Sequence, residues 1–143
     1  MQRLRSIRLS LLASALVAVG ITACENASPP PQSEQVLAWE PVGTWSGEAN
    51  VQTESFTSTT GTFKFTWEAH DTGSEPGHLD IMLHSAVSGR PLVQAVDHMG
   101  SGKGSIYVNE DPREFYVVVA AERTRWTLKV DEGISLILTP TKH

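Results

Sequence analysis

The stretch Thr-Phe-Lys-Phe-Thr-Trp-Glu-Ala-His, residues 62–70, decides the fold of this chain. Every second residue in it is apolar, and these residues are Phe63, Phe65, Trp67 and Ala69. Because successive side chains of a β-strand point to opposite faces of its sheet, this period of two predicts a strand with one buried and one solvated face.

The segment that follows predicts a second strand beside the first. Residues 71–77 (Asp-Thr-Gly-Ser-Glu-Pro-Gly) are dense in turn-forming residues, and residues 78–84 alternate again between polar and apolar. Two amphipathic strands around a Gly/Pro loop favour a β-hairpin, in which we expect Ala69 to pair with Leu79.

The rest of the chain after the N-terminal leader repeats this pattern. Further strands are expected at 45–51, 54–59, 91–97, 105–108, 114–121, 125–130 and 134–139. Residues 98–104 are expected to form a glycine-rich loop and residues 131–133 a turn. Eight or nine short strands without helical periodicity predict an all-β fold, an antiparallel β-sandwich of jelly-roll or immunoglobulin-like type, with a closed barrel as the second choice.

The first 23 residues differ from this pattern. Arg3, Arg5 and Arg8 precede an uncharged run from residue 9 to residue 23. A basic start, a short apolar core and small residues at its end are typical of a cleaved, helical signal peptide. The uncharged run has 15 residues, whereas a spanning helix needs about 20, so a permanent transmembrane anchor is the weaker interpretation.

The end of this leader carries a more specific motif. Ile21-Thr22-Ala23-Cys24 resembles the bacterial lipobox, and Cys24 is the single cysteine of the chain. The resemblance implies that Cys24 receives a lipid, that residues 1–23 are removed, and that the protein is anchored in the cell envelope. In Gram-negative lipoproteins, an aspartate directly after the lipidated cysteine retains the protein in the inner membrane. The residue here is Glu25, so the resemblance implies the outer membrane if the source is Gram-negative. An ordinary signal peptide, cut after Ala23 or Ala27, is the alternative.

Two further segments follow from this division. Residues 24–38 are expected to be a lipidated cysteine and a Pro-rich tether, and residues 39–143 the β-sandwich domain. The whole chain has a charge of −5, and the leader contributes three arginines and no acid, so the mature part has a charge of −8. An acidic surface opposes binding to nucleic acid.

The expected hairpin would bring four possible metal ligands together. With Ala69 opposite Leu79, His70 would face His78 and Glu68 would face Asp80. Two imidazoles and two carboxylates suit zinc. The default interpretation is a solvated polar face without a metal, and the sequence predicts no cofactor.

Other motifs give little support for a catalytic site. The run from Gly100 to Ser105 resembles a phosphate-binding loop, but glycine follows Lys103 where that loop needs Ser or Thr. No Gly-x-Ser-x-Gly nucleophile motif occurs. Trp39 or Trp45, near the tether, could stack on sugar rings if exposed.

The segments 43–47, 63–67 and 126–130 loosely resemble those of small β domains carried by uncharacterised bacterial lipoproteins. Together, the patterns favour a non-catalytic, membrane-anchored envelope lipoprotein whose sandwich binds an envelope protein or glycan, or has a structural role. A metal- or glycan-binding module is the alternative, and a small hydrolase is less favoured.

Overall fold

The computed structural model describes residues 32–139, so the expected signal peptide and Cys24 lie outside the described residues. No helix in this range is long and apolar enough to cross a membrane. Its nine strands are β1 (Glu34–Gly47), β2 (Val51–Gln52), β3 (Phe56–Thr57), β4 (Thr62–Asp71), β5 (His78–Ser85), β6 (Pro91–Met99), β7 (Gly102–Asn109), β8 (Glu114–Glu122) and β9 (Thr124–Leu138).

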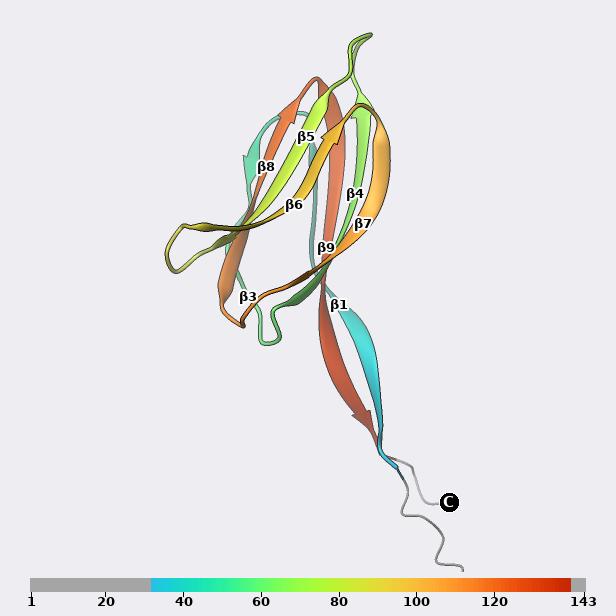
Figure 1. The fold of residues 1–143 in the computed structure, drawn as a ribbon, viewed down its shortest axis with the longest axis vertical. Coiled ribbons are helices and arrows are strands. Elements are labelled where there is room, and N and C mark those ends of the chain that lie inside the picture. The colour runs from blue at the N-terminus through green and yellow to red at the C-terminus, as the bar shows by residue number, and fades with distance from the viewer. Residues whose placement is uncertain (1–31, 140–143) are drawn as a thin grey trace, which may run out of the picture. The chain divides into compact units, whose positions relative to one another are not determined.

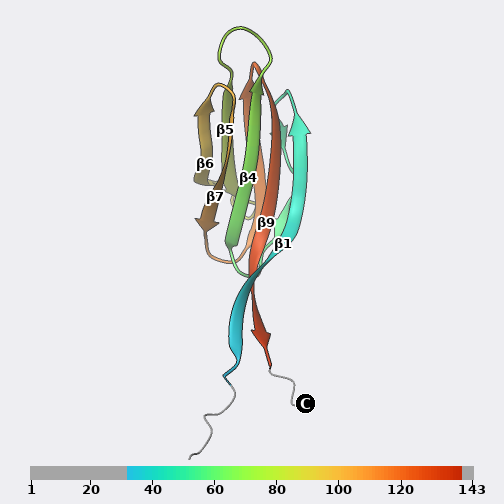
Figure 2. The same cartoon turned by 90° about the vertical axis from the view of Figure 1, so that its right-hand side faces the viewer.

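These strands form two antiparallel sheets packed face to face (Figures 1 and 2). One sheet has the order β1-β9-β4-β7, and the other has the order β2-β8-β5-β6, with β3 also paired to β8. The predicted all-β sandwich is therefore confirmed.

The pairing is nested, as if one long hairpin had been folded over. β1 pairs with β9, β2 and β3 pair with β8, β4 pairs with β7, and β5 pairs with β6 at the closed end. β4 also pairs with β9, and β5 also pairs with β8, and these pairings join the nested strand pairs into two sheets. This order is that of a jelly roll, one of the two expected sandwich types.

The core lies between the inward faces of β4 and β9 in one sheet and β5 and β8 in the other. Phe63 of β4 meets Phe115 of β8 edge to face, with ring centroids 5.1 Å apart. Trp126 of β9 is 1% exposed, and its Nε1 donates a hydrogen bond to the carbonyl of Ala49. Each such buried apolar side chain stabilises the fold by about 1.5–3 kcal/mol.

The predicted hairpin between residues 62–70 and 78–84 is wrong. β4 and β5 lie in different sheets, and the loop between them crosses from one sheet to the other. Ala69 pairs with Gly102 and Trp126, whereas Leu79 pairs with His98 and Ala121. The alternation of polar and apolar residues shows which face of a strand is buried. It does not show whether the next strand pairs with it in the same sheet or packs against it from the other sheet, because both arrangements produce the same alternation.

The predicted turn at residues 131–133 is also wrong, because β9 continues through it to Leu138. Asp131 pairs with Lys64 on one side and Pro41 on the other, so pairing on both sides keeps this segment extended. Gly133 contributes by its small size, since a Cβ there would lie 3.1 Å from the ring of Trp39.

The glycine-rich segment 98–104 is mostly strand rather than loop. β6 ends at Met99 and β7 begins at Gly102, and Gly100 takes the positive φ of 82° that the tight turn requires. Gly104 faces the ring of Trp67, with an added Cβ only 3.2 Å from its Nε1. The glycine thus makes room for the indole of Trp67, which stacks at a tilt on His98.

The folded part begins earlier than the predicted boundary at residue 39. Glu34 pairs with Leu138, and the pairing continues to Ala38 opposite Ile134. These ends of β1 and β9 form a two-stranded ribbon that projects beyond the sandwich (Figures 1 and 2). The exposed apolar residues on it are Val36, Leu37, Leu136, Ile137 and Leu138.

One carboxylate holds the loop between β3 and β4. Oε1 of Glu132 accepts hydrogen bonds from the Ser58 hydroxyl at 2.6 Å, the Thr59 amide at 3.0 Å, the Thr60 amide at 3.1 Å and the Thr60 hydroxyl at 3.0 Å. Burial by itself raises the pKa of Glu132, but these hydrogen bonds outweigh it and lower the pKa below its usual value of 4.5.

We predict that Glu132→Gln lowers the free energy of unfolding by about 1–2 kcal/mol at pH 7, because hydrogen bonds to a charged acceptor are stronger than those to an amide. The pKa of Glu132 is lower in the folded than in the unfolded chain, so its contribution is present above pH 4.5 and is lost as the pH falls through the folded-state pKa. Urea unfolding of both proteins between pH 3 and pH 7 measures this.

The difference in stability between wild type and Glu132→Gln should therefore narrow towards pH 3. Glu75→Gln is the matched control, because Glu75 is an exposed carboxylate with no hydrogen bond to another described residue. A pH-independent difference, or an equal loss in the control, would contradict the assigned role of Glu132.

A second prediction concerns Gly61, in the same loop. Gly61 has a φ of 70°, and an added Cβ would lie 1.8 Å from the carbonyl oxygen of Glu110. Gly61→Ala should cost more than about 2 kcal/mol, since the left-handed backbone alone costs about 1–2 kcal/mol for alanine. Gly73→Ala, with nothing within 4 Å of the added Cβ, should change the stability by less than about 0.5 kcal/mol. Thermal unfolding of the two variants tests this contrast.

Candidate functional site

The outer face of the four-stranded sheet gathers polar side chains from three strands. Thr66 of β4 lies between Lys129 of β9 and Ser105 of β7. In the next row, Glu68 lies between Thr127 and Lys103. In the row on the other side of Thr66, the residues are Asp131, Lys64 and Tyr107. We call these nine residues the lysine face.

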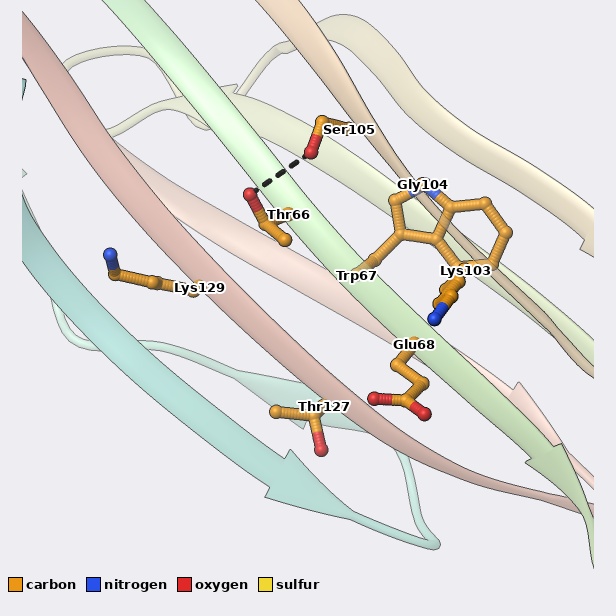
Figure 3. Close-up of a pocket in the computed structure, with 8 residues that line it drawn as sticks. All are labelled: Thr66, Trp67, Glu68, Lys103, Gly104, Ser105, Thr127 and Lys129. Carbon is orange, nitrogen blue, oxygen red and sulfur yellow. Dashed lines mark hydrogen bonds between the residues drawn. The ribbon is translucent and has the colours of Figure 1, made fainter.

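An open hollow of about 470 Å³ lies on this face (Figure 3). It is lined by Thr66, Trp67, Glu68, Lys103, Gly104, Ser105, Thr127 and Lys129. The hydroxyls of Thr66 and Ser105 are 3.2 Å apart and form a hydrogen bond across the strands. The hollow is therefore a shallow depression in a sheet, lined by the hydroxyls of Thr66, Ser105 and Thr127, the amines of Lys103 and Lys129 and the carboxylate of Glu68.

The lysine face differs in charge from the rest of the molecule. It holds Lys64, Lys103 and Lys129, the three lysines of residues 32–139. Outside that range lie one of the 16 acidic residues and four of the 11 basic residues of the chain, so the described part has a net charge of −8. The three lysines are thus gathered on one face of an acidic body, whereas the four arginines of the described range lie outside the lysine face.

The two carboxylates of the lysine face each bind a neighbouring side chain. Asp131, whose side chain is 7% exposed, forms an ion pair with Lys129 at 3.0 Å. Glu68 forms a hydrogen bond with Nε2 of His70 at 2.8 Å. By contrast, neither Lys64 nor Lys103 forms an ion pair with any residue of the described range.

Tyr107 of the lysine face forms an aromatic pair with Trp39 at the edge of that face. Trp39 from β1 and Tyr107 from β7 meet with ring centroids 5.6 Å apart and planes at 47°. The indole of Trp39 contacts Gly133, which has no side chain to displace it, and Tyr107 is 60% exposed. Of the two tryptophans considered for sugar stacking, Trp39 is half-buried at this outer face, whereas Trp45 packs against the core.

The sequence analysis did not identify Tyr107 as a candidate binding residue. The alternation of residues 105–108 places Tyr107 on the solvated face of its strand, so its exposure could have been predicted. Its aromatic neighbour could not, because a strand of four residues does not show which strand lies beside it. Its partner Trp39 is 68 positions away along the chain, so only the sheet order brings the two rings together.

The four possible metal ligands are not brought together. Glu68 and His70 lie on β4 of one sheet, and His78 and Asp80 lie on β5 of the other. Within residues 32–139, no group of three or more His, Cys, Asp and Glu side chains is arranged to hold a metal. The predicted arrangement depended on the hairpin pairing, which is wrong.

The outer face of the second sheet instead carries an acidic cluster. Asp80 lies directly opposite Asp97, and His78 lies beside Glu122 on β8. Nε2 of His78 is 2.7 Å from Asp97, and the Gln94 amide donates a hydrogen bond of 2.5 Å to Asp80. The two outer faces of the sandwich therefore differ in the sign of their charge.

Comparisons with known proteins give only a distant likeness. No family model and no curated protein matches the chain. One solved structure, from a study of Bacillus endospore appendages described as a family of disulfide-linked pili, aligns with a TM-score of 0.41 and 16% identity, covering 88% of this chain and 97% of that chain. Because this TM-score is below 0.5, we carry no property of that protein over to this chain.

Proposed function

We propose that this protein is a lipid-anchored, non-catalytic protein of the bacterial cell envelope, whose jelly roll binds a partner from that compartment. The observation that carries the binding role is the lysine face, an open surface of amines, hydroxyls and aromatic rings on an otherwise acidic domain. The anchor rests on the lipobox-like sequence that ends at Cys24. The outer membrane is favoured if the source is Gram-negative.

The position of the chain ends supports presentation of the domain by an anchor. The described chain enters at the tip of the ribbon through Glu34, and nine residues separate Cys24 from it. Three of these nine residues are the consecutive prolines 29–31, which favour an extended chain of about 3.1 Å per residue. A lipid on Cys24 would therefore attach the protein through the segment that leads into the start of β1.

Two features support a binding rather than a catalytic role. The residues that line the hollow include neither a histidine nor a cysteine, and its two nearest hydroxyls, on Thr66 and Ser105, bond to each other. Glu132, the carboxylate with a lowered pKa, is used to hold a loop. A hydrolase would need a nucleophile beside a base, and Glu68, the carboxylate that lines the hollow, forms its hydrogen bond with His70 rather than with one of these hydroxyls.

The second candidate function is a glycan-binding module. The specific observation in its favour is the pair of Trp39 and Tyr107, because an exposed aromatic ring gives a sugar ring an apolar surface to pack on. A metal-binding module has lost its support, since the proposed ligands lie in two sheets.

The anchor is tested by the intact mass of the protein from the membrane fraction, beside a Cys24→Ala variant. We expect a mature chain that begins at Cys24 and carries the added mass of acyl groups. The variant should lack this added mass and leave the membrane fraction, because two or more acyl chains are needed for stable attachment.

The matched control is Ser28→Ala, which changes a residue of the tether but leaves the lipobox-like sequence intact. It should retain the acyl mass and the membrane location. An unmodified wild-type protein in the soluble fraction would refute the anchor, whereas the binding role of the sandwich would then be sought among secreted ligands.

A further inference from the structure

We infer that the lysine face and the adjoining pair of Trp39 and Tyr107 form one binding site for an anionic glycan, a chain of sugar rings that carry acidic groups. This inference rests on the proposed binding role and names the chemical class of its ligand. It concerns the sandwich alone and does not depend on the lipid on Cys24.

The charge distribution indicates an anionic ligand. Lys64 and Lys103 form no ion pair within the described range, and they lie on the same face as Lys129. Asp131 is nearly buried and paired with Lys129, so the negative charge that it presents to a ligand is largely offset. Because the other outer face is acidic, the lysine face is the outer sheet face that favours the approach of an anion.

The neighbouring groups indicate a sugar rather than a small inorganic anion. Tyr107 is 60% exposed beside Trp39, so a flat apolar surface adjoins the amines. The hydroxyls of Thr66, Ser105 and Thr127 lie within the hollow at the centre of the face. Sugar rings offer C–H faces to aromatic rings and hydroxyls to polar side chains, so they match both parts of this surface, whereas phosphate or sulfate matches only the amines.

The length of the face indicates an oligomer. Trp39 lies over the row that contains Thr62 and Gly133, Tyr107 lies in the row of Lys64, and the hollow reaches the row that contains Glu68. The rows of Thr62 and Glu68 are six residues apart along β4, and a strand rises about 3.3 Å per residue, so the site is about 20 Å long. A single sugar would occupy only one part of it, and a chain along the strands would contact rings, amines and hydroxyls together.

The test is calorimetric titration of the purified mature protein, in detergent where it carries a lipid. The probes are oligogalacturonate, which is a carboxylated sugar chain, a neutral maltooligosaccharide of the same length, and polyphosphate, which is an anion without sugar rings. We expect oligogalacturonate to bind most tightly, and its affinity to fall with added salt, because salt screens the lysines.

Variants locate the site. Tyr107→Ala should weaken oligogalacturonate binding by about tenfold or more, as expected for loss of an aromatic anchor. The double variant Lys64→Gln/Lys103→Gln should weaken it and flatten its salt dependence. The controls are Tyr116→Ala, a tyrosine on the outer face of the other sheet, and Arg90→Gln, an exposed cation away from the lysine face, and both should bind as wild type does. Far-UV circular dichroism confirms that each variant is folded.

Three results would overturn the inference. They are no oligogalacturonate binding at millimolar concentration, unchanged binding by Tyr107→Ala and the lysine variant, and polyphosphate binding as tight as that of oligogalacturonate. If an envelope protein is captured through this sandwich while no glycan binds, the proposed function survives and the inference fails. If the intact mass shows no lipid while the glycan binds, the anchor fails and the inference stands.

Discussion

The packing of β4 and β9 against β5 and β8 is the interaction on which the rest of this structure depends. These four strands supply most of the buried apolar side chains, with Phe63 and Phe115 in direct contact across the two sheets. The described range contains no helix to cover the sheets. Since the inward positions satisfy the core, the outward positions of the same strands are free to carry charge, and the lysine face and the acidic face are built there.

Much of the fold could be predicted from the sequence, because burial depends on local alternation. Phe63, Phe65 and Leu79 are fully buried, as their positions in the pattern predicted. The pairing could not be predicted in the same way. A strand of alternating residues buries the same side chains whether its neighbour along the chain lies beside it or faces it from the other sheet. The false turn at 131–133 has a related cause, because pairing on both sides of β9 outweighs the turn preference of its residues.

The candidate site was still less predictable. Its lysines are separated by 39 and 26 positions, and they meet because β7 and β9 both pair with β4. In the sequence, each one is an ordinary polar residue of an amphipathic strand. Trp39, one of the two tryptophans that could be exposed, lies half-buried at the outer face. Its contact with Tyr107 follows from the order of the strands in the sheet, which the residue pattern of one strand does not reveal.

The ribbon of β1 and β9 has a practical consequence for production of the isolated domain. A recombinant chain begun at Trp39 would remove the partner of Ile134 to Leu138. That last third of β9 would then present unpaired amides and carbonyls beside the exposed Leu136 and Ile137. Apolar edge strands of this kind recruit strands from other molecules. Such a truncation would be prone to aggregation, although its core is complete, and a start before Glu34 avoids this.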